Sequence, residues 1–156
     1  MKLILIYPKW PKLDRQTEFH LPPHGPVVFA ASLPEDVAVD FIDENLQEID
    51  FDDPVDFVGI SMMLTIQAKR AWEIADAYRA RGVKVIFGGI ATMLHREEVS
   101  QFADSIFLGE VEDGRLASVL EDWKKEQLQQ SYDYFHDFPP IESVGPANRD
   151  ILNEEL

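Results

Sequence analysis

Two turns contain the residues of this sequence that are best suited to hold a ligand. The first reads Ser61-Met62-Met63-Leu64-Thr65, and the second reads Gly88-Gly89-Ile90-Ala91-Thr92. The two hydroxyl groups of the first turn can donate or accept hydrogen bonds. The paired glycines of the second turn remove two side chains, so that a flat group can lie against the backbone. Helix capping and a plain tight turn are the structural alternatives, and the combination of the two turns favours a site for a bulky ligand.

The segments around these turns have the pattern of a βαβ unit. Residues 57–60 and 83–87 are short apolar runs without polar alternation, as expected for strands covered by helices on both faces. Between them, apolar residues recur at helical spacing from Ala68 to Tyr78, and Gly82 can end that helix. Both turns follow strand ends. In an open parallel sheet, ligands bind at that edge.

Further strands and helices alternate along the chain. We expect strands at residues 2–7, 37–42 and 105–108, and helices at residues 27–33, 95–103 and 116–129. This alternation predicts an α/β fold with a doubly wound, five-stranded parallel sheet, flavodoxin-like in the order 2-1-3-4-5, and helices on both faces.

Two segments fall outside this alternation. Residues 8–26 contain five prolines and form a long connection after the first strand, and long loops of this kind are usually functional or mobile. Residues 131–156 contain aromatic residues and prolines but no stable period. We therefore expect an α/β domain over residues 1–130 and an extended tail or linker over residues 131–156.

Composition narrows the partners. The net charge of −15 argues against nucleic acid and anionic membrane surfaces, which bind basic proteins. No apolar run approaches the ~20 residues that a membrane span needs, and we expect a cytoplasmic protein. The sequence has no cysteine, which fits that compartment and excludes cysteine nucleophiles, thiolate zinc sites and iron–sulfur clusters within these residues.

Several ligands of this architecture can be tested by residue type. The turn after the first predicted strand, Pro8-Lys9-Trp10-Pro11, has neither the acidic residues of a phospho-receiver domain nor the glycines of a dinucleotide fold. His20 and His24 have the i, i+4 spacing of a helical metal site, but Pro22 and Pro23 between them prevent that helix. For these two histidines a structural or solvated role, contact with a ligand and an independent metal site remain open, in that order of preference.

In order and spacing, the Ser/Thr turn, the Gly-Gly turn and the Leu108–Arg115 segment (LGEVEDGR) resemble the cobalamin-binding domain at the N-terminus of cobalamin-dependent radical S-adenosylmethionine enzymes. The resemblance covers nearly the whole chain. It implies that the two turns hold the dimethylbenzimidazole nucleotide tail and that the corrin ring rests over the sheet edge. The residues it implies as cofactor contacts are Pro8, Lys9, Trp10, Ser61, Met62, Met63, Leu64, Thr65, Gly88, Gly89, Ile90, Ala91, Gly109, Glu110 and Val111.

One departure from related domains matters for the cobalt. Methionine synthase-like domains carry an Asp-x-His-x-x-Gly motif after strand 1, and no histidine stands at that place here. The resemblance therefore implies base-off cobalamin without a histidine ligand, and no residue of this chain as a catalytic group or metal ligand.

The resemblance also implies a larger enzyme. We expect the chain to be the N-terminal part of a methyltransferase or cyclase whose radical S-adenosylmethionine barrel supplies the 4Fe-4S cluster and binds S-adenosylmethionine. The barrel is then an expected partner, and the isolated domain could form a homodimer. The alternatives are a docking or structural module of the same parent that does not bind cobalamin, and a nucleotide-binding protein that uses Gly88-Gly89 for phosphate.

Overall fold

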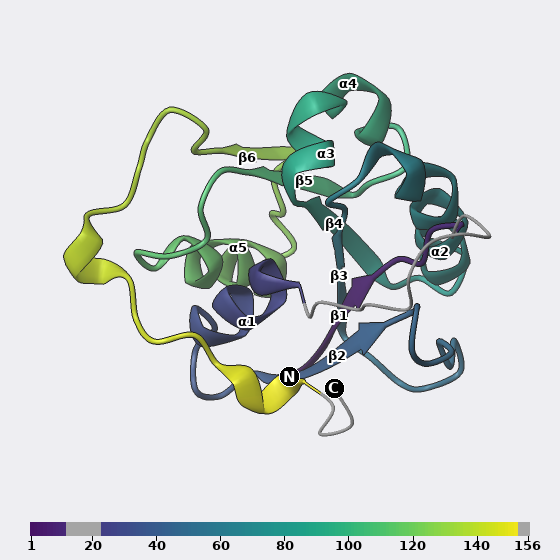
Figure 1. The fold of residues 1–156 in the computed structure, drawn as a ribbon, viewed down its shortest axis with the longest axis horizontal. Helices are drawn as coiled ribbons and strands as arrows, with labels where there is room; N and C mark the ends of the chain where they lie inside the picture. Colours follow the sequence, from purple (N-terminus) through teal and green to yellow (C-terminus); the bar gives the residue numbers. More distant parts are fainter. Residues whose placement is uncertain (12–22, 153–156) are drawn as a thin grey trace.

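The structure is a computed structural model that describes residues 1–11 and 23–152. At its centre lies a six-stranded sheet in the order β2-β1-β3-β4-β5-β6, with every neighbouring pair parallel (Figure 1). The strands are β1 (Lys2–Tyr7), β2 (Ala38–Asp43), β3 (Phe57–Ser61), β4 (Lys84–Gly88), β5 (Ser105–Leu108) and β6 (Ser131–Asp133). The predicted order of the first five strands is confirmed. The sheet has one strand more, because β6, from the segment that lacks a periodic pattern, pairs with β5.

Helices cover both faces of the sheet, as predicted. Helices α1 and α5 pack on one face, and α2, α3 and α4 pack on the other (Figure 1). The helical segments are α1 (His24–Ala31), η1 (Thr65–Gln67), α2 (Ala68–Arg79), α3 (Ile90–Leu94), α4 (Arg96–Val99), α5 (Arg115–Lys124), η2 (Ile141–Ser143) and η3 (Arg149–Ile151). None of the described helices is long and apolar enough to cross a membrane.

Several helix boundaries differ from the sequence prediction. Helix α1 begins at His24, ahead of the predicted start, because the first turn of a helix tolerates the missing N–H of Pro26. The helix predicted at 95–103 is shorter and is α4, and an additional helix that was not predicted, α3, precedes it and begins directly after Gly89. The bend falls at His95, whose φ of −123° is not helical. Helix α5 ends at Lys124, shortly before Glu126 adopts a φ of 57°.

Alternation along the strands divides the core into two clusters. Val58, Ile60 and Phe87 point to the α2 face, whereas Phe57, Ile86 and Phe107 point to the α1 and α5 face. Towards the carboxyl ends of β3, β4 and β5, the positions in phase with this second set carry small residues. These are Gly59, Ser61, Gly88 and Gly109. The α1 and α5 face therefore loses its large side chains at the edge where ligands bind.

Candidate functional site

A pocket of about 380 Å³ lies where these small residues gather, between the sheet, α1 and α5. Its inner wall is apolar and consists of the buried or half-buried residues Leu5, Phe29, Gly59, Ile86, Phe107 and Leu116. Its mouth lies at the carboxyl edge of the sheet and consists of the exposed residues His24, Gly25, Ile90 and Glu110 and the half-buried Glu112. A closed apolar end and a polar rim are the usual features of a small-molecule site.

Missing side chains create the room. A Cβ atom at Gly59 would lie 3.0 Å from Leu5 Cδ1 and 3.8 Å from Phe29 Cζ, so this strand position sets the depth of the pocket. A Cβ atom at Gly88 would meet nothing nearer than the Phe107 carbonyl oxygen at 3.9 Å. Gly88 pairs with Ser61 in the sheet register, which places the two small residues side by side at the rim.

Glycine is required at position 89 for a different reason, which is the conformation of the backbone. Its φ is 93°, in the region that side chains other than glycine rarely adopt. A Cβ atom there would lie 2.5 Å from the Met62 carbonyl oxygen. That oxygen accepts a hydrogen bond from the Ala91 N–H at 3.0 Å. Gly89 thus lets the turn after β4 close tightly over the turn after β3.

Eight of the fifteen residues implied by the resemblance line the pocket. They are Ser61, Met63, Gly88, Gly89, Ile90, Gly109, Glu110 and Val111. Met62 and Ala91 instead lie buried in the core of the opposite face. Leu64 and Thr65 are exposed outside the pocket, and Thr65 Oγ1 lies 3.0 Å from His95 Nε2. Pro8, Lys9 and Trp10 lie beyond it, in the loop after β1.

Gln67 connects that loop to the Ser/Thr turn, although the sequence pattern did not single it out. Its buried side-chain oxygen accepts hydrogen bonds from the N–H groups of Met63 at 2.9 Å and Leu64 at 2.8 Å. Its amide nitrogen donates to the Pro8 carbonyl oxygen at 2.6 Å. One side chain therefore positions both loops that meet beside the pocket. Burial, followed by the charge of Asp43, raises the pKa of the nearby Tyr7 phenol.

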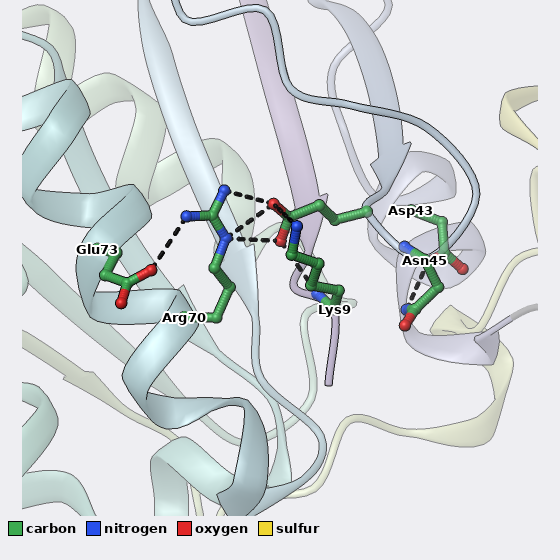
Figure 2. Close-up of polar contacts among 6 residues, drawn as sticks. Lys9, Asp43, Asn45, Arg70 and Glu73 are labelled. Atoms are coloured by element: carbon green, nitrogen blue, oxygen red, sulfur yellow. Dashed lines mark hydrogen bonds and ion pairs between the residues drawn. The ribbon is translucent and has the colours of Figure 1, made fainter. Parts of the chain in front are cut away.

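A second polar cluster fixes the loop after β1 from the other side (Figure 2). The Glu44 carboxylate, 3% exposed, accepts hydrogen bonds from Arg70 Nε at 2.8 and 3.0 Å and from the Lys9 backbone N–H at 3.1 Å. The hydrogen bond to Glu44 raises the pKa of the Arg70 guanidinium, against the effect of burial. Such a compensated carboxylate is a structural anchor.

The described residues do not offer a metal site. They include no group of three or more His, Asp or Glu side chains placed to hold an ion. His24 stands at the pocket mouth, while His20 lies outside the described residues. Among the described residues that line the pocket, there is no lysine or arginine to attract a phosphate.

Other lining residues also escaped the sequence prediction. Leu5, Gly59, Ile86 and Phe107 read as ordinary strand residues, and Phe29 reads as a core residue of a helix. The available signal was the alternation itself, because Gly59, Ser61, Gly88 and Gly109 fall on one face of three neighbouring strands.

The fold and pocket together define a flavodoxin-like α/β domain with a ligand pocket at the carboxyl edge of its sheet. The chain is 36% identical over 122 residues to the bacteriochlorophyllide d C-8(2)-methyltransferase of Chlorobaculum tepidum. The match covers 78% of this chain and 26% of the relative, so it spans about a quarter of that protein. That relative is a methyltransferase, and the match supports the family resemblance drawn from the motifs. No protein-family model and no solved structure matches the chain.

Proposed function

We propose that this chain binds cobalamin, with the nucleotide tail inserted into the pocket and the corrin ring over the carboxyl edge of the sheet. The observation that carries the proposal is the row of small residues at Gly59, Ser61, Gly88 and Gly109, which opens an apolar slot at that edge. An aromatic base fits such a slot by stacking and burial alone.

The residues around the slot suit the rest of the cofactor. Ser61 and Glu110 supply polar groups at the rim for the amide-bearing edge of a corrin. Glu112 Oε2 is buried and has no hydrogen-bond partner among the described residues, so it can accept from a ligand amide. Exposed apolar side chains of Leu64, Ile66, Ile90 and Leu94 provide a surface against which a large ring can rest.

We propose that the tail enters base-off and that no histidine replaces it on the cobalt. The described part of the loop after β1, residues 8–11, has no histidine, and His95 contacts Thr65 outside the pocket. His24 lies at the rim, and its replacement tests this part of the proposal.

The wider role is that of one domain of a larger enzyme. The matched relative is a methyltransferase about four times the length of the match, which supports a radical S-adenosylmethionine methyltransferase as the parent. Cobalamin, when bound, would supply methyl-transfer chemistry. This chain's own residues bind and orient the cofactor, and the barrel of the parent, which would bind the 4Fe-4S cluster and S-adenosylmethionine, is the proposed partner. We propose that the protein acts in the cytoplasm.

A docking module without cobalamin is the second candidate. It is favoured by two apolar side chains that the segment after β6 exposes, Phe138 at 76% and Ile141 at 87%. Burial of such side chains against the barrel would stabilise an assembled enzyme. In an isolated domain, the same residues could support a homodimer. A free-nucleotide site is disfavoured, since the described residues at the rim carry acidic groups and no cation.

Calorimetric titration of hydroxocobalamin and methylcobalamin into the purified chain tests the proposal. We expect saturable binding of one cofactor per chain, weakened at least tenfold by Ser61→Leu and by Gly88→Leu, which fill the rim. Gly145→Leu is the matched control because no atom lies within 4 Å of a Cβ atom there and Gly145 lies outside this pocket. Absence of binding at high micromolar cofactor, with the fold intact, would favour the docking module.

A further inference from the structure

We infer that the pocket selects among cobamides by the polarity of their lower base, taking a base with an apolar outer edge and rejecting a purine. This inference rests on the proposed function and deepens it. Cobamides share the corrin ring and differ in the base of the nucleotide tail. The chemistry of the pocket's closed end therefore decides which of them the chain binds best.

The closed end offers a polar base no partner. Its described side chains, those of Leu5, Phe29, Ile86, Phe107 and Leu116, are aliphatic or aromatic and carry no donor or acceptor. The backbone there is engaged in the sheet, where Gly59 stands in register with Leu5 on one side and Ile86 on the other. The polar side chains of the pocket belong to other residues, namely the exposed His24 and Glu110 and the half-buried Ser61 and Glu112.

Dimethylbenzimidazole suits a pocket whose closed end is apolar. Its outer edge carries two methyl groups, which gain from burial between phenylalanine and aliphatic side chains. Adenine presents ring nitrogens and an exocyclic amino group on the corresponding edge. A buried donor or acceptor without a partner lowers affinity about tenfold or more. The same flat shape is therefore accepted in one case and rejected in the other.

Gly59 sets how far the base can enter. A Cβ atom there would press on Leu5 Cδ1 at 3.0 Å, the far end of a flexible side chain, so Gly59→Ala narrows the slot at little cost to the fold. The strand position has an ordinary φ, in contrast to Gly89. We expect Gly59→Ala to weaken cobalamin binding about tenfold, and Gly145→Ala, in open space, to leave it unchanged.

The test is calorimetric titration of the full chain with three cobamides that share corrin and upper ligand. Their lower bases are dimethylbenzimidazole, adenine and a methylphenol, the last being apolar and unable to ligate cobalt. We expect similar affinities for the first and third, and about tenfold or more weaker binding of the adenine form. Equal affinity for all three would overturn the selectivity and leave the proposed function standing. Preference for the adenine form would also overturn it. Binding of none of the three would refute the proposed function and the selectivity with it.

Discussion

Gly88 and Gly89 are neighbours, but an added methyl group would meet different surroundings at each. Gly89 has a φ of 93° and faces the Met62 backbone, whereas Gly88 has open pocket space beside it. We expect Gly89→Ala to lower the free energy of unfolding by about 2–3 kcal/mol, and Gly88→Ala to change it by less than about 1 kcal/mol. Urea denaturation measures both.

The same pair separates fold from binding. Gly88→Ala projects a methyl group into the rim, so it should weaken cobalamin binding while the protein stays folded. Equal destabilisation by the two substitutions would show that Gly88 is also required by the turn. For this reason Gly88 is a better position than Gly89 for probing the ligand.

Gln67 is the residue that joins two loops without lining the pocket. Gln67→Ala leaves the N–H groups of Met63 and Leu64 without their acceptor, and we expect a loss of about 2 kcal/mol in the free energy of unfolding. Because the loops position Ser61, cobalamin affinity should also fall. Gln67→Glu retains the acceptor oxygen but sets a second acceptor against the Pro8 carbonyl oxygen in a buried site, so it should not restore the stability of the native protein. Stability that is unchanged in Gln67→Ala would contradict this positioning role.

At the scale of elements, the strand pattern could be predicted, and most of the site could not. Short apolar runs such as 57–60 and 83–87 identify buried parallel strands because helices cover both faces. The β6 strand was missed because only Tyr132 of its three residues is buried, so neither an apolar run nor a period stands out. Helix α3 was missed because it begins without a side-chain cap, at a glycine whose conformation depends on the contact with Met62.

The pocket shows the same limit more sharply. Ser61, Gly88 and Gly109 could be recognised from residue type and order, because polar and glycine residues at strand ends signal a ligand edge. Leu5 and Phe29 could not, because a hydrophobic residue that lines a pocket has the same sequence signature as one in a filled core. The missing volume arises between elements, at Gly59, and becomes visible only when β1 and α1 are placed against it.

Helix α2 gives the fold a defined response to alkaline pH. Burial, followed by the charge of Asp53, raises the pKa of Tyr78 to about 12. Since the folded protein holds this proton more tightly than the unfolded chain, the contribution to stability is complete below about pH 10 and is lost as the pH rises from about 10 to about 12. Burial likewise raises the pKa of Tyr132 in β6 to about 12, and the same window applies.

Tyr78→Phe isolates the part of the alkaline loss of stability that is due to Tyr78 in α2. The Tyr78 hydroxyl is buried without a partner among the described residues, so its removal should leave stability at neutral pH unchanged or raised. The decline between about pH 10 and pH 12 should become smaller. Urea denaturation across that range measures both, and an unchanged alkaline decline would rule out Tyr78 as its source.

For the whole molecule, charge and surface point to a ligand and a partner of different kinds. The net charge of −15 and the acidic pocket rim disfavour anionic ligands, whereas the neutral amides of a corrin can hydrogen-bond to carboxylates. The segment after β6 exposes the apolar side chains of Phe138 and Ile141. Neither side chain lines the pocket, and replacing both by serine should leave cobalamin affinity unchanged.

The visible absorption spectrum of bound methylcobalamin tests the central claim most directly. If the nucleotide tail of the cofactor lies in the pocket and no side chain replaces its base on the cobalt, the spectrum of the complex will be that of the base-off form. His24→Ala will then give the same spectrum, because His24 does not ligate the cobalt. A base-on spectrum in the complex would contradict insertion of the tail. A nitrogen-ligated spectrum that becomes base-off in His24→Ala would show that His24 supplies the lower ligand.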